Sequence, residues 1–152
     1  MSIAQRLEEL GLTLPAVVPP VASYVPAVSA NGFVYTSGQL PMVDGAMPRI
    51  GKVGAEVSPE DAQADARQCA LNALAAIEAE IGSLDRVTRI VKVVGFVASA
   101  EGFRGQPGVV NGASDVLGEI FGDDGRHARS AVGVAELPLG APVEVELIVA
   151  YA

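Results

Sequence analysis

The chain has 152 residues, of which 50% are hydrophobic, and its formal net charge at pH 7 is -8. This length fits one domain, and the apolar content is sufficient for a core without disulfides or a metal. The negative charge disfavours nucleic-acid binding, because it would repel a phosphate backbone and the ten basic residues are scattered along the chain.

The N-terminus, from Met1 to Leu14, is predicted to form a retained amphipathic helix, because its apolar residues recur at helical spacing. The prolines at positions 15, 19 and 20 then predict an extended connector, since proline cannot continue a helix. We therefore divide the chain into an N-terminal helix with its connector, residues 1–20, and a main domain, residues 21–152.

A β-hairpin is predicted at the start of the main domain. Its strands are expected at about Tyr24–Val28 and Phe33–Ser37, and the Asn31-Gly32 pair between them tolerates the positive φ of a tight turn. A loop follows to Val57.

The clearest helix in the sequence is expected to begin after Ser58. This serine is a favourable N-cap, Pro59 suits the first helical position, and acidic residues follow in the first turn. Apolar residues then recur at steps of three and four as far as Ile81, and Gly82 is a natural stop.

The second half of the chain predicts one central strand, one helix and two final strands. We expect these at Arg89–Ala98, Val109–Phe121, Ser130–Glu136 and Val143–Tyr151. The order is then ββαβαββ, an α+β fold with one sheet and two helices on one face. The other sheet face would stay partly apolar, which favours oligomerisation.

The cysteine and histidine content and the hydropathy of the chain bear on disulfides, metal binding and membrane association. The single Cys69 excludes an intramolecular disulfide and fits a reducing cytoplasm, and one histidine leaves no soft-ligand metal cluster, although carboxylate-only sites stay open. No apolar run approaches the roughly 20 residues that span a bilayer, so we expect no membrane association.

Three stretches of the sequence share a pattern with a known family. They are Tyr24 with the following strand, the segment Thr36–Pro41 (TSGQLP), and the run from Ala128-Arg129-Ser130 through Leu137-Pro138 to Val143–Glu146. From about Val21 to its end the chain resembles the RidA (YjgF/YER057c/UK114) family, which is also called the endoribonuclease L-PSP family.

The resemblance implies a chorismate-mutase-like homotrimer whose sheets line a central barrel, with three clefts between neighbouring subunits. It also implies an enamine/imine deaminase that hydrolyses 2-imino acids to 2-keto acids and ammonia. Such an activity needs no metal and no organic cofactor, and its ligand is a small carboxylate or imino acid.

Arg129 and Glu144 are the residues that this resemblance makes catalytic. The Arg129 guanidinium can bind the substrate carboxylate through two hydrogen bonds; a structural salt bridge is the alternative. A hairpin could return Glu144 toward Arg129, where its carboxylate could move protons to and from water or the departing nitrogen. Alternatively, Glu144 pairs with Arg129 only to hold the trimer. Glu146 shares its strand face, so the choice of Glu144 depends on the motif.

Four further residues match the family's binding positions. Tyr24 would close the cleft, and Gly38, beside Ser37, would let backbone N–H groups approach a ligand. A packed hairpin aromatic and a simple strand-ending turn are the alternatives. Asn111 matches a helix asparagine, although its separation from Arg129 is one residue longer than the pattern predicts.

Ala131 also belongs to the implied site, but it occurs where deaminase members commonly have cysteine, and Ser114 replaces an expected aromatic residue. These departures indicate a divergent branch. They also motivate a second hypothesis, a non-catalytic trimer that binds a small carboxylate or a partner. A third, the endoribonuclease activity of some relatives, is disfavoured by the acidic charge.

Overall fold

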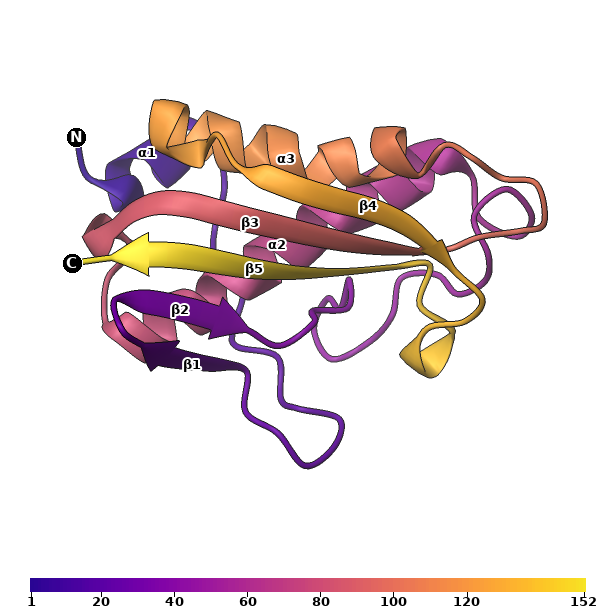
Figure 1. Ribbon diagram of the computed structural model, residues 1–152, viewed down its shortest axis with the longest axis horizontal. Coiled ribbons are helices and arrows are strands. Elements are labelled where there is room, and N and C mark those ends of the chain that lie inside the picture. Colours follow the sequence, from indigo (N-terminus) through magenta and orange to yellow (C-terminus); the bar gives the residue numbers. More distant parts are fainter.

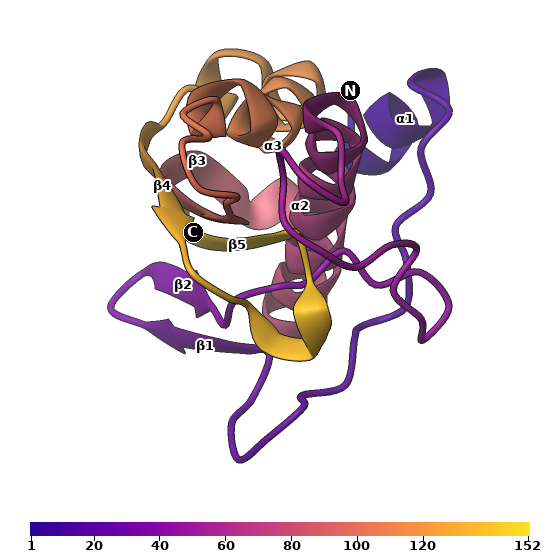
Figure 2. The same ribbon diagram turned by 90° about the vertical axis from the view of Figure 1, so that its right-hand side faces the viewer.

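The computed structural model describes residues 1–152 and shows one sheet with the long helices on a single face (Figures 1 and 2). The strands are β1 (Ala27–Ala30), β2 (Phe33–Thr36), β3 (Val87–Ala98), β4 (Ala128–Val134) and β5 (Val143–Tyr151). The helices are α1 (Ile3–Glu9), α2 (Pro59–Ile81) and α3 (Gln106–Phe121), with short 3-10 turns η1 (Leu84–Arg86), η2 (Gly122–Gly125) and η3 (Pro138–Gly140). The predicted α+β class and the ββαβαββ order are confirmed.

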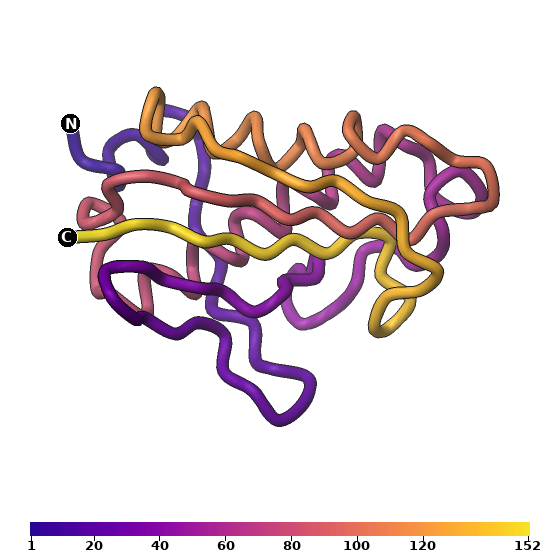
Figure 3. The backbone as a smooth tube through the Cα atoms, in the orientation of Figure 1, coloured from indigo at the N-terminus to yellow at the C-terminus, as the bar shows by residue number.

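The order of the strands across the sheet is β1-β2-β5-β3-β4. Neighbouring strands are antiparallel except β3 and β4, which are parallel and are joined through α3. Figure 3 shows the consequence along the backbone: β3 runs between β4 and β5. The last two strands of the chain are therefore not partners in the sheet.

Local signals explain where α2 begins and ends. The Ser58 Oγ accepts a hydrogen bond from the Asp61 N–H at 3.1 Å, and Pro59 is the first helical residue. Gly82 ends the helix with φ 89°, a left-handed conformation that favours glycine. Both predicted ends of this helix are confirmed.

The predicted bounds of α3 need correction, because the helix begins at Gln106 rather than at Val109. Its Pro107 suits the first turn, where the missing N–H costs nothing. Gly112, which weakens the helix pattern in the sequence, lies where α3 meets α2. A Cβ there would lie 2.9 Å from the main-chain carbonyl carbon of Gln63, so the glycine permits the close contact between the helices.

Several other predicted bounds also shift. α1 is shorter than the predicted helix to Leu14, because Gly11 adopts φ 69° just after it. The hairpin turn at Asn31-Gly32 is confirmed, but β1 begins only after Pro26, which cannot donate to a ladder. β4 lies two residues before the predicted span, since it pairs with β3 only as far as Val134. β5 agrees with the prediction.

Alternation along the strands separates a buried sheet face from an open one. On β5 the side chains of Val143, Val145, Leu147 and Val149 are buried against the helices. The open face carries Phe33, Tyr35 and Val132, which are 36%, 42% and 44% exposed. The two long helices lie on the other face, as predicted. No helix combines the length and apolar character needed to cross a bilayer.

Candidate functional site

Gly38 and Glu144 are held side by side where the chain leaves β2. The Gln39 N–H donates to the Val145 carbonyl at 2.8 Å and the Val145 N–H donates to the Gln39 carbonyl at 3.0 Å, which fixes this segment against β5. The Glu144 carboxyl group occupies the space that a side chain at position 38 would need. A side chain at position 38 would therefore displace the Glu144 carboxyl group. The N–H of Gly38 makes no backbone hydrogen bond.

The Glu144 carboxylate is half-buried and forms no ion pair within the chain. Burial raises its pKa above the ordinary value of 4.5, and the nearby charge of Glu146 raises it further. Glu146 does lie on the same face of β5, as the period of two predicts. An unpaired carboxyl group with a raised pKa can accept and return a proton near neutral pH more readily than an exposed one.

Tyr24 and Ser37 lie beside this carboxylate, although both hydroxyls are engaged by the preceding loop. The Tyr24 hydroxyl accepts a hydrogen bond from the Val21 N–H at 3.1 Å, and the Ser37 hydroxyl donates to the Val25 carbonyl. Together with Glu144 they line an open hollow of about 400 Å³, whose full lining is Val21, Ala22, Tyr24, Ser37, Gly38, Leu40, Pro138 and Glu144. Four of the predicted site residues therefore meet in one chain.

Arg129 lies on the edge strand β4 and is positioned by α3. Its guanidinium donates to the Ser114 hydroxyl at 3.1 Å and to the Pro107 carbonyl at 3.0 Å. It forms no ion pair with any carboxylate of the chain, so the structural salt bridge is not found here. The remaining N–H donors of the half-buried guanidinium are available to a carboxylate ligand.

Asn111 and Ala131 accompany Arg129. Asn111 lies on α3 between Pro107 and Ser114 at steps of four and three, which places it on the helix side that holds the guanidinium. Ala131 follows Arg129 on the same face of β4 and packs against the core. Burial lowers the pKa of the nearby His127, and the Arg129 charge lowers it further.

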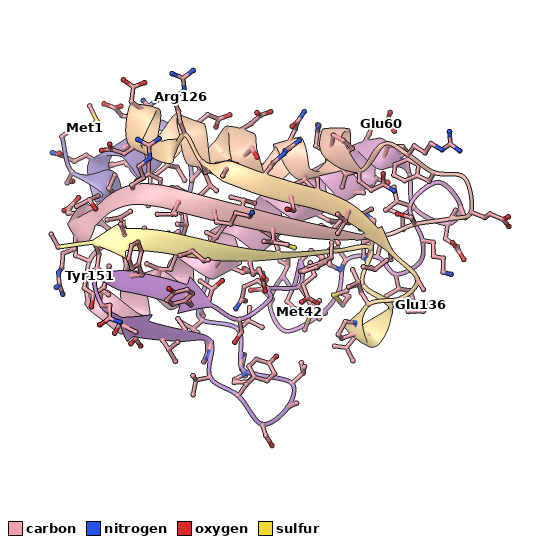
Figure 4. All side chains as sticks on the ribbon, viewed as in Figure 1. Met1, Met42, Glu60, Arg126, Glu136 and Tyr151 are labelled. Carbon is pink, nitrogen blue, oxygen red and sulfur yellow. The ribbon has the colours of Figure 1, made fainter.

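The expectation that a hairpin brings Glu144 back to Arg129 is wrong for a single chain. Arg129 pairs with Val93 on the buried face, whereas Glu144 pairs with Phe96 on the open face. β3 also separates their strands, which adds roughly 10 Å at the usual strand spacing. In Figure 4, Arg126, shortly before Arg129, lies at the α3 edge at the top of the view, and Met42, shortly after Gly38, lies below β5, away from that edge.

The structure thus places the candidate residues in two separate groups. We call Tyr24, Ser37, Gly38 and Glu144 the glutamate half-site, and Asn111, Ser114, Arg129 and Ala131 the arginine half-site. In the sequence Ser114 stands out only because it replaces an expected aromatic residue, which does not predict its hydrogen bond with Arg129. The spacing of Pro107, Asn111 and Ser114 along one helix side was the available signal.

Comparisons with known proteins agree with this fold. Residues 14–151 match the family model described as Endoribonuclease L-PSP. Protein TCP17 of Trypanosoma cruzi is 45% identical over 148 residues, covering 97% of this chain and 92% of that protein. The 2-iminobutanoate/2-iminopropanoate deaminase of Dermatophagoides farinae is 33% identical over 138 residues, covering 91% of this chain and 93% of that protein.

A solved structure resembles the whole chain. Atu1372 from Agrobacterium tumefaciens, described as of unknown function, is 44% identical and superposes with a TM-score of 0.91, covering 99% of this chain and 94% of that chain. The sheet, its two covering helices and their order define a RidA-like α+β protein. The chain belongs to the endoribonuclease L-PSP family, which is the RidA (YjgF/YER057c/UK114) family.

Proposed function

We propose that this protein is a cofactor-independent enamine/imine deaminase that hydrolyses 2-imino acids to 2-keto acids and ammonia. The observation that carries the proposal is the Glu144 carboxylate, which is half-buried, unpaired and raised in pKa beside the free N–H of Gly38. The similarity to the named deaminase of Dermatophagoides farinae supports the same reaction.

In the proposed reaction Arg129 binds the substrate carboxylate through its unused N–H donors. Glu144 takes a proton from water as the water oxygen attacks the imine carbon, and the C=N bond becomes a C–N bond. Glu144 passes this proton to the nitrogen, which gives a carbinolamine with a hydroxyl and an amino group on the same carbon. The proton of that hydroxyl then passes through Glu144 to the amino group as the C–N bond breaks, so ammonia leaves and the carbon keeps the oxygen as a keto group. One imino acid and one water give one keto acid and one ammonia.

The two half-sites can act together only if different copies of the chain supply them. We propose the homotrimer, with the arginine half-site of one copy beside the glutamate half-site of the next. The exposed apolar side chains of the open sheet face, Phe33, Tyr35 and Val132, support an assembly that covers them. Light scattering should then give a mass of three times 15.5 kDa.

The activity is tested by generating 2-iminopropanoate and 2-iminobutanoate in situ and following keto-acid formation. The wild type should accelerate it, and both Arg129→Ala and Glu144→Gln should abolish the acceleration. Arg126→Ala is the matched control, because Arg126 is an exposed arginine on the loop before β4. Equal rates with and without the wild-type protein would refute the deaminase.

Complementation tests whether the site is shared between copies. Arg129→Ala and Glu144→Gln chains are refolded together, so that mixed trimers contain seams with an intact Arg129 from one copy and an intact Glu144 from the next. Random mixing would leave about a quarter of all seams intact. Recovery of activity on this scale supports a shared site, and no recovery despite mixed trimers contradicts it.

A non-catalytic trimer that binds a small carboxylate is the second candidate. It is favoured by Ala131, which leaves a methyl group where deaminase members commonly have a thiol, and by Ser114 at an aromatic position. This candidate predicts that 2-keto acids raise the melting temperature in an Arg129-dependent way without any imine turnover.

For both candidates we propose a cytoplasmic location, which the single buried Cys69 supports.

A further inference from the structure

The N-terminal helix is fixed to the body of the protein. The Ile3 N–H donates to the Asp85 carboxylate at 2.7 Å, and the Arg6 guanidinium donates to the Glu119 carbonyl at the end of α3 at 2.8 Å. The Leu7 side chain is buried in the core. The family model begins at residue 14, so α1 is an addition to the part of the chain that the model describes.

The connector after α1 is held much more loosely. From residue 13 to residue 23 its main chain takes part in only two hydrogen bonds, from Tyr24 N–H to the Ala22 carbonyl and from Val21 N–H to the Tyr24 hydroxyl. It crosses the outer side of α2 (Figures 1 and 2), and a hollow of about 620 Å³ separates it from the loop around Asp44. Its position therefore depends mainly on its two ends, α1 and β1, and on Leu14, which packs against the core.

The last residues of the connector line the glutamate half-site. Val21 and Ala22 line the hollow of about 400 Å³ that contains Glu144, and Val21 is 52% exposed. Leu40 and Pro138 add further apolar surface, and Glu144 is the one charged side chain in the lining. A ligand group that carries a negative charge would be repelled here, whereas an apolar group would be desolvated against four apolar residues.

We propose that residues 3–22, which we call the arm, set the side-chain specificity of the site. α1 anchors the arm. The substrate is a 2-imino acid whose apolar side chain is larger than the side chains of alanine and 2-aminobutyrate. This side chain packs against four residues, Val21, Ala22, Leu40 and Pro138. The hollow of about 400 Å³ belongs to the single chain, and its four apolar lining residues leave room for more than a methyl or ethyl group beside the arginine half-site of the next copy. This inference rests on the proposed deaminase function and adds the class of substrate.

The first test compares imines generated in situ from alanine, leucine and glutamate. Each methylene group that is buried should favour binding about fourfold, so kcat/KM for the leucine imine should exceed that for the alanine imine by at least about tenfold. The glutamate imine should be the poorest substrate. Equal values of kcat/KM for the leucine and glutamate imines would overturn the apolar specificity.

Two variants test the arm itself. Val21→Ser should lower kcat/KM for the leucine imine by about tenfold and leave the alanine imine nearly unchanged. Its matched control is Val25→Ser, because Val25 is 55% exposed and does not line the hollow. Arg6→Ala removes one of the contacts that hold α1 and should act in the same selective way, with a smaller effect than Val21→Ser. Arg67→Ala removes a side-chain contact to the same Glu119 and should not act selectively. A uniform loss on all imines, or none, would contradict the role of the arm.

A binding measurement separates this inference from the proposed function. Pyruvate and 4-methyl-2-oxopentanoate are titrated into the wild type and Val21→Ser by calorimetry. If no imine is hydrolysed but the larger keto acid binds more tightly and Val21→Ser removes that preference, the deaminase proposal fails and the role of the arm stands. If the wild type binds both keto acids equally tightly, the role of the arm is refuted, whether or not the protein hydrolyses imines.

Discussion

Gly38 and the carboxyl group of Glu144 are in direct contact: a Cβ at position 38 would lie 2.6 Å from the Glu144 Cδ and 3.0 Å from its Cγ. Contacts this short are not tolerated, so any side chain at position 38 must displace the carboxylate. The φ of Gly38 is not in the left-handed region, so the constraint comes from space and not from backbone conformation.

Gly38→Ala should therefore reduce activity by moving Glu144. We expect kcat/KM to fall by about 100-fold, since a displacement of about 1 Å at a reacting group has effects of that size. Gly118→Ala is the control, because nothing lies within 4 Å of a Cβ there. The control should keep full activity and gain roughly 0.5–1 kcal/mol of stability in the helix. Wild-type kinetics in Gly38→Ala would disprove the arrangement.

Ser114→Ala should weaken substrate binding, because the Ser114 hydroxyl accepts a hydrogen bond from Arg129 at 3.1 Å. Loss of about 1 kcal/mol of orientation corresponds to roughly a fivefold rise in KM, with kcat less affected. Steady-state kinetics with an in situ imine measure both constants. Ser130→Ala, one residue from Arg129 and exposed, should leave KM unchanged. The same KM in both variants would show that Ser114 does not position Arg129.

The pH dependence of activity should report the ionisation of Glu144. Because burial and Glu146 raise its pKa, kcat/KM should rise with pH through a value above 4.5 and then level off as the carboxylate becomes fully ionised. Glu146→Gln removes the like charge and should shift this rise to lower pH. A pH–rate profile that is identical in wild type and Glu146→Gln would mean that another group controls the rise.

Asp65 should make stability depend on pH. This residue is buried on α2, pairs with Arg49, and leaves its Oδ2 without a hydrogen-bond partner. Burial raises its pKa above the ordinary 3.8 despite the opposing effect of Arg49. A carboxyl group with a raised folded-state pKa contributes stability below its unfolded pKa, and that contribution is lost as the pH rises through the folded value.

The melting temperature of the Asp65→Asn variant should therefore be close to that of the wild type at about pH 3–4. Toward neutral pH it should exceed the wild-type melting temperature by a growing margin, because the amide never ionises. Thermal unfolding across this pH range measures the difference. Asp115→Asn, at an exposed position on α3, should show no such trend. A difference in melting temperature that stays constant with pH would mean that Asp65 ionises normally in the folded protein.

Elements with local causes were predictable from the sequence alone. The ends of α2 follow from Ser58, Pro59 and Gly82, which act on the hydrogen bonds of their own helix ends. The span of β5 follows from its alternation of residues. Motif spacing alone made Arg129, Glu144, Tyr24 and Gly38 candidates for the site, and this choice stays a prediction. The bounds of β1 and β4 were less predictable, because a strand extends only as far as its partner does.

The strand order was decided by the tertiary structure. β4 and β5 are consecutive in the sequence and resemble a hairpin, but the crossover through α3 places β4 beside β3, so β3 separates Arg129 from Glu144. Strand pairing is a non-local competition that no single segment encodes. The sequence by itself therefore determined which side chains are candidates for the chemistry, whereas the tertiary structure placed Glu144 on the central strand β5 and Arg129 on the edge strand β4.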